Sequence, residues 1–81
     1  MTGLVADVFV LIVIQDGLNI EVAARWDERG AEQALLAWFE REFDETLPEE
    51  HQEALDVVHD TLGALLGRYR YEIVECRVSD L

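Results

Sequence analysis

The sequence predicts a small α+β domain with the element order ββααβ, in which a three-stranded sheet carries two antiparallel helices on one face. Three observations predict this class. A run of seven apolar residues ends in Asp16-Gly17, two later segments have the apolar spacing of amphipathic helices, and an alternating segment follows them. The 81 residues form a single domain, 1–81, because a chain of this length holds one small core.

The first two strands are expected to form a hairpin. Residues from about Ala6 to Gln15 are mostly β-branched, aromatic or leucine, which favours a strand. Asp16-Gly17 tolerates the positive φ angles of a type I′ turn, so a second strand is expected from Leu18 to about Trp26. With a regular register, the opposed pairs are Gln15 and Leu18, Val13 and Ile20, Leu11 and Val22, and Phe9 and Ala24.

The two faces of this hairpin differ. Alternation of side chains predicts a core face formed by Phe9, Leu11, Val13, Leu18, Ile20, Val22, Ala24 and Trp26. The second strand places Asn19, Glu21, Ala23 and Arg25 on the other face, where the first strand places Val8, Val10, Ile12 and Ile14. Four exposed β-branched residues favour aggregation. We therefore expect Val8, Val10, Ile12 and Ile14 to form a homodimer or to dock a partner, unless neighbouring side chains shield them.

Two helices are expected after the hairpin. Asp27 is a good N-cap for the first, which should run to about Phe43. Thr46 and Glu49 form a capping-box pattern, which predicts a second helix that starts there and ends at Leu66, before Gly67. The expected buried residues of the second helix are Ala54, Leu55, Val58, Leu62, Leu65 and Leu66.

The third strand is expected from Tyr69 to Val78. It has Tyr69, Tyr71 and Ile73 on one face and Val74, Cys76 and Val78 on the other, which suggests a bulge or a strand covered on both faces. Beside the first strand it gives the order 2-1-3 in a mixed sheet, and beside the second it gives an antiparallel 1-2-3 sheet. We favour 2-1-3, because a strand that is apolar on both faces suits the centre.

Few residues are typical of catalysis or of metal binding. His51 and His59 lie ~12 Å apart along a helix, too far to share a metal ion, so we expect structural roles for both. The single cysteine, Cys76, excludes an internal disulfide and is expected to be a small core residue. No Gly-x-Ser-x-Gly motif or glycine-rich phosphate loop is present. We expect no enzyme, no metal ion and no cofactor.

The chain is strongly acidic. It has 18 acids and 6 bases, all arginine, and a net charge of −12. Such a surface repels phosphates, so we expect no direct nucleic-acid binding. We expect no membrane span and no targeting segment either, which indicates a cytoplasmic protein.

Half of the acids lie between Glu40 and Asp60. The candidates for binding a partner are Glu40, Asp44, Glu45, Glu49, Glu50, Glu53, Asp56 and Asp60. Like-charge pairs four residues apart on a helix destabilise it by about 0.2–0.5 kcal/mol each. One explanation is that the carboxylates imitate phosphates and occupy the basic nucleic-acid-binding site of a protein. The other is a solvated face adapted for solubility or high salt.

In its size, acidity, lack of lysine and α+β order, the chain resembles the small acidic anti-defence proteins of bacteriophages, which include anti-CRISPR inhibitors that imitate DNA. The resemblance covers the whole chain but includes no motif, so it assigns no role to any residue. It implies a non-enzymatic inhibitor that acts inside a host cell on a nucleic-acid-binding protein. The alternative function is a structural homodimerisation domain, with or without adaptation to high salt, that has no dedicated partner.

Overall fold

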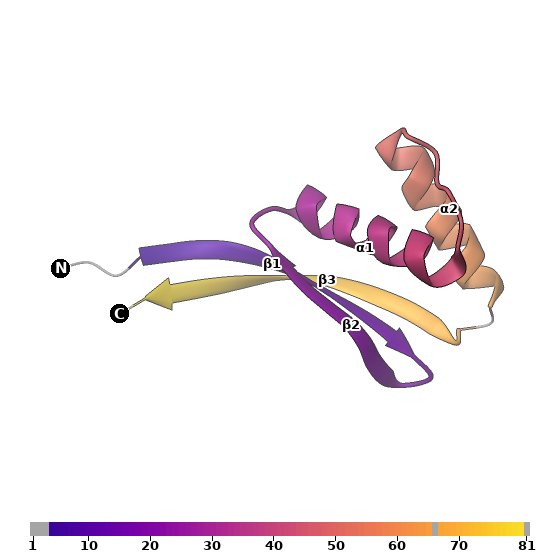
Figure 1. Cartoon of the computed structure of the whole chain (residues 1–81). Coiled ribbons are helices and arrows are strands. Elements are labelled where there is room, and N and C mark those ends of the chain that lie inside the picture. Colours follow the sequence, from indigo (N-terminus) through magenta and orange to yellow (C-terminus); the bar gives the residue numbers. More distant parts are fainter. Residues whose placement is uncertain (1–3, 66, 81) are drawn as a thin grey trace.

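A computed structural model describes residues 4–65 and 67–80 and confirms the α+β class and the order ββααβ. The elements are β1 (Leu4–Gln15), β2 (Leu18–Arg25), α1 (Glu28–Phe43), α2 (His51–Ala64) and β3 (Tyr69–Asp80). The sheet has the favoured order β2-β1-β3, with the strand that is apolar on both faces at its centre. Both helices lie on one side of this sheet (Figure 1).

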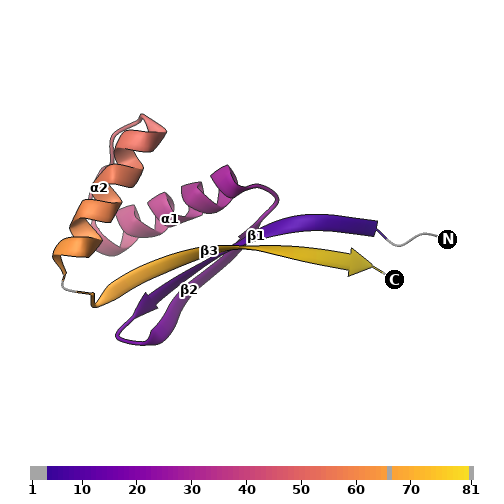
Figure 2. The ribbon, with the colours of Figure 1, turned by 180° about the vertical axis from the view of Figure 1, so that it is seen from behind.

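The direction of β3 differs from the expected one. β3 runs antiparallel to β1, with Tyr69 opposite Gln15, so the sheet is antiparallel throughout and not mixed. The loop after α1 leads away from the sheet, and α2 runs back toward the end of the sheet that carries the β1–β2 turn (Figures 1 and 2). There the Asp16 N–H donates to the Arg68 carbonyl over 2.8 Å. Because the chain re-enters the sheet beside the hairpin turn, β3 has to run back along β1.

The hairpin turn has the predicted form. Asp16 and Gly17 have φ values of 52° and 85°, as a type I′ turn requires, and Gln15 opposes Leu18. The register then shifts between Val13 and Ile14 of β1. On β2 this irregularity leaves one residue, Ile20, without an opposite residue, which is a β-bulge.

The bulge reverses the faces of β2. The expected pairs beyond the turn are wrong: Val13 with Ile20, Leu11 with Val22, and Phe9 with Ala24. Leu11 instead opposes Ala23, and Phe9 opposes Arg25. A shift of one residue moves every following side chain to the other face of the sheet. The expected core residues Val22 and Ala24 are therefore exposed, Val22 at 62%. Ile20 in the bulge is 38% exposed, and Trp26, beyond the end of β2, is 78% exposed. Leu18 precedes the bulge and keeps its expected position opposite Gln15, but beside the turn it is 70% exposed.

The first helix begins and ends where the sequence predicts. The Asp27 side chain accepts the Gly30 N–H over 2.6 Å, and α1 ends at Phe43. Asp44 follows in the left-handed conformation, with a φ of 52°, and its N–H donates to the Glu40 carbonyl. Both ends of α1 are thus fixed by local contacts.

The second helix begins later than expected. The predicted capping box at Thr46 is not used, because the Glu50 side chain caps α2 and accepts the Glu53 N–H over 2.6 Å. Leu47 explains the delay: its side chain is buried and its N–H donates to Oε2 of Glu40 over 2.9 Å, so this segment stays irregular. α2 ends at Ala64, before the expected end at Leu66, a residue that lies outside the described ones.

The core lies between the sheet and the two helices. Its buried residues are Leu11, Val13, Ala31, Leu35, Trp38, Phe39, Leu47, Ala54, Leu55, Val58 and Leu62. The predicted stripe of α2 is confirmed for Ala54, Leu55, Val58 and Leu62, and Leu65 is partly buried. From β3, Tyr69, Tyr71 and Ile73 pack against this core from one regular face, without the suggested bulge.

Beyond the helices, β1 and β3 extend as a two-stranded arm. β2 pairs with β1 only from Phe9 to Gln15, whereas β3 pairs with β1 from Leu4 onward. Figures 1 and 2 show the arm pointing away from both helices. An ion pair of 3.4 Å between Arg77 and Asp7 links its two strands. The helices therefore cover only the hairpin half of the sheet.

Candidate interaction surfaces

The eight acids predicted to bind a partner are all exposed, and we call them the acidic surface. They are Glu40 of α1, then Asp44, Glu45, Glu49 and Glu50 of the loop, and Glu53, Asp56 and Asp60 of α2. The three acids of α2 are three and four residues apart, which places them on one side of the helix. The buried residues of α2 lie on its other side.

Some of these acids have local roles that the sequence analysis missed. Oε2 of Glu40 accepts the Leu47 N–H, and Oε2 of Glu50 accepts the N-terminal Glu53 N–H of α2. Oδ1 of Asp56 accepts the side-chain amide of Gln52 over 3.1 Å. Caps and loop anchors therefore account for Glu40 and Glu50. The N-terminus of α2 also favours the negative charge of Glu53.

The base within the acidic segment does not neutralise it. Arg41 reaches away to β2, where its Nη2 lies 3.1 Å from Oε2 of Glu21. The ion pairs among residues 4–65 and 67–80 involve none of the eight acids. The acidic surface therefore carries a concentrated negative potential, which attracts cationic groups.

The sheet face opposite the helices is a second candidate surface, and we call it the outer face. Its apolar residues are Val8, Val10, Ile12 and Ile14 of β1, Val22 and Ala24 of β2, and Val74 and Cys76 of β3. Asn19, Arg70 and Glu72 complete the face beside Ile12 and Ile14. The four β1 residues expected to form a dimer face all lie here and are half-buried by their neighbours. Val22 and Val74 are 62% and 40% exposed. Both views show the helices on the other side of the sheet (Figures 1 and 2).

The β2 residues of the outer face could not be found by assuming regular alternation. Val22 and Ala24 reach it only because of the β-bulge, so they were expected in the core. Cys76 was also expected in the core, and that expectation is wrong, because its side chain is exposed. Pairing with Val8 places Cys76 on the uncovered side of β3.

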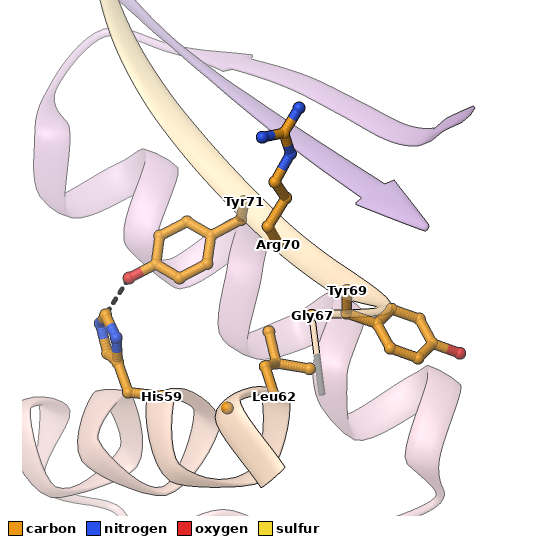
Figure 3. A pocket seen from close by; sticks show the side chains of 7 residues that line it. His59, Leu62, Gly67, Tyr69, Arg70 and Tyr71 are labelled. Carbon is orange, nitrogen blue, oxygen red and sulfur yellow. Dashed lines mark hydrogen bonds between the residues drawn. The ribbon is translucent and has the colours of Figure 1, made fainter. Parts of the chain in front are cut away.

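The two histidines have separate partners and hold the helices in place. Nε2 of His51 donates to Oε1 of Glu32 over 2.8 Å, which joins α2 to α1. Nε2 of His59 and the Tyr71 hydroxyl share a hydrogen bond of 2.5 Å, which joins α2 to β3 (Figure 3). Among the residues that the structure describes, no group of three or more His, Cys, Asp or Glu could hold a metal ion.

An open hollow of about 410 Å³ lies beside the bond between His59 and Tyr71. Leu62, Tyr69 and Arg70 line it as well, and the Arg70 side chain extends away from α2 (Figure 3). Burial, with a smaller contribution from the Glu32 carboxylate, raises the pKa of Tyr71 above its usual 10.0. The phenol is therefore protonated at neutral pH, and its hydrogen bond ties two elements of the fold together.

Comparisons with protein-family models, with curated proteins and with solved structures find no match for this chain. None of the helices described here is long and apolar enough to cross a membrane. The acidic surface and the outer face are thus the features from which function has to be inferred. They lie on opposite sides of the molecule and have opposite chemistry.

Proposed function

We propose that the protein is a non-enzymatic inhibitor whose acidic surface occupies a basic nucleic-acid-binding site on a partner protein. One observation carries this proposal. Glu53, Asp56 and Asp60 share one exposed side of α2, while Arg41 pairs with Glu21 away from it. A basic groove that binds phosphates finds similar negative charges on this rigid helix.

The spacing of the helical acids supports the proposal. From Glu53 to Asp60 the helix rises ~10 Å, so that it presents one charge about every 5 Å. One strand of B-DNA presents a charge every ~3.4 Å along its axis. The helix is a sparser row of charges than a DNA strand, and the acids of the adjoining loop add to it.

Asp60 is the acid of α2 that local structure explains least, because Glu53 lies at the helix N-terminus and Asp56 accepts a hydrogen bond from Gln52. Asp56 and Asp60 nevertheless carry like charges. As a like-charge pair four residues apart, they destabilise α2 by about 0.2–0.5 kcal/mol. Asp60 also lies toward the C-terminal end of α2, where the helix dipole disfavours an acid, and the last turn contains no base. A basic partner turns these unfavourable charges into favourable contacts and accelerates association.

Capture from a bacterial lysate by the immobilised chain tests this function. We expect a nucleic-acid-binding protein that duplex DNA displaces and that binds about 10- to 100-fold more weakly between ~50 and ~200 mM salt. The double variant Asp56→Lys/Asp60→Lys should lose this binding. The matched control, Glu28→Lys/Glu75→Lys, changes the net charge equally but lies outside the acidic surface, and it should keep the binding.

Binding that survives DNA, high salt and the charge reversal on α2 would exclude phosphate imitation. Equal losses in both double variants would show that net charge alone matters, which also contradicts the proposal. The alternative function expected from the sequence, homodimerisation, uses the opposite side of the molecule. Dimerisation is therefore compatible with the proposed function, whereas a domain without a dedicated partner is not.

A further inference from the structure

The outer face combines apolar character with exposure to solvent. Its projected size follows from seven residues of β1 at ~3.4 Å each and three strands ~4.8 Å apart, which gives about 350 Å². The largest apolar patch of a typical monomer covers ~300–600 Å² of accessible surface. The adjoining arm adds to this projected area, but the face remains smaller than the ~800 Å² that each partner contributes to a standard interface, so a contact through it is a small one.

Charge on the outer face identifies the kind of partner that fits. The chain carries a net charge of −12, but between Val8 and Ile14 the strand partners contribute only Arg70 and Glu72 as charged residues on this side. These two have opposite signs, so this part of the face is neutral. A basic partner needs an excess of acids, and an anionic lipid surface repels a chain of this charge.

Two copies of an acidic protein repel each other wherever their charged surfaces meet. The outer face lets them meet without that repulsion, because it is neutral and apolar. A two-fold relation also makes the same patch contact itself, which lets Arg70 of one copy approach Glu72 of the other. Valine and isoleucine side chains suit such a contact, because their stiff χ1 angles lose little freedom on burial.

We propose that the outer face is the interface with a second copy of this chain. The two sheets then stack face to face, ~10 Å apart, in a four-layer particle with the helices on both outsides. The two acidic surfaces point away from each other, which keeps their charges apart. This proposal does not depend on the proposed function, because it uses the other side of the molecule.

Sedimentation velocity of the full chain at micromolar concentration tests the interface. We expect a species of twice the 9.3 kDa of one chain. High salt should leave this dimer intact or strengthen it, because the buried surface is apolar. A partner bound through the acidic surface responds to salt in the opposite way, so the two proposals fail independently.

Single substitutions on the outer face locate the contact. Val22→Glu and Val74→Glu introduce a charge at positions that are exposed in one copy, so each variant should fold and should weaken the dimer at least about tenfold. Leu18→Glu is the matched control. Leu18 is 70% exposed and opposes Gln15 beside the hairpin turn, off the outer face, so this variant should remain dimeric.

Cys76 reports on the same contact without a change in sequence. Its thiol is exposed in one copy and should react slowly with a maleimide in the dimer and rapidly in Val22→Glu. A wild-type chain that is folded by circular dichroism but sediments as a monomer would overturn the proposal. A dimer that both glutamate variants leave intact, or that salt dissociates, would overturn it as well.

Discussion

The two faces of the sheet show how one strand serves two different surfaces. Leu11 and Val13 of β1 point toward the helices and are fully buried. Their neighbours Val10 and Ile12 point the other way and remain half-buried in a single copy. Both faces of β1 are equally apolar in sequence, but only one acquires its cover from the same chain. An apolar strand face is therefore expected to be buried, but the sequence alone does not distinguish burial by the same chain from burial by a second molecule.

The layer that covers the inner face also carries the charge. α1 and α2 bury one side against the sheet, and the exposed side of α2 holds the acids. The outer face has no such layer and remains neutral between Val8 and Ile14. Charge and apolar area are thus separated onto opposite sides of a thin molecule. Such separation allows two interactions to occur at once without competing.

The largest expected effect compares an aromatic residue beneath the helices with one outside them. Phe39 is fully buried, so Phe39→Ala should lower the free energy of unfolding by about 3–5 kcal/mol. Trp26 is 78% exposed, so Trp26→Ala should change it by less than ~0.5 kcal/mol. Urea denaturation followed by circular dichroism measures both values. Similar losses in the two variants would contradict the burial that distinguishes them.

A smaller effect compares two valines on opposite faces of the sheet. Val13 is fully buried, and Val13→Ala should lower the free energy of unfolding by about 2 kcal/mol. Val22 is largely exposed, and Val22→Ala should lower it by less than ~0.5 kcal/mol.

Both valine variants are measured by urea denaturation in the Val74→Glu background, which separates folding from the proposed dimerisation. When Val74 is restored, Val22→Ala should show a further loss in the free energy of unfolding that depends on protein concentration. Val13→Ala should show no such further loss. If Val22→Ala were the more damaging change in the monomeric background, the assignment of inner and outer faces would be wrong.

The features that the sequence predicts correctly are those determined by near neighbours in the chain. The type I′ turn at Asp16-Gly17 and the Asp27 cap depend on residues within one turn of the chain. The central position of β1 followed from its apolar residues alone. These features need no knowledge of distant contacts.

Distant contacts explain what the sequence did not reveal. The bulge in β2 places the small Ala23 against the core and lets Glu21 meet Arg41 of α1, twenty residues away. The direction of β3 depends on the loop that Leu47 and Glu40 hold irregular before α2. A register based on alternation cannot anticipate either contact.

The two candidate surfaces were accordingly predicted to different extents. All eight acids are exposed, as a solvated or partner-binding surface requires, because a run of charges is rarely buried. For the outer face, the four β1 residues were identified, but Val22, Ala24 and Cys76 were assigned to the core. These three residues lie on β2 and β3, where the register and the covering elements depend on the rest of the fold.

The smallest expected effect concerns the edge of the helical cover, where α2 meets β3. Tyr71 hydrogen bonds with His59 there, so Tyr71→Phe should lower the free energy of unfolding by about 0.5–1.5 kcal/mol. Because burial raises the pKa of Tyr71, the unfolded chain loses this proton first, near pH 10.0, and the folded chain loses it at a higher pH. The stability from this shift is complete below pH 10.0 and is lost as the pH rises through the raised pKa. The free energy of unfolding measured in urea should therefore decline more steeply from neutral to alkaline pH in the wild type than in Tyr71→Phe. Parallel curves would show that the Tyr71 phenol is not buried beneath the helices.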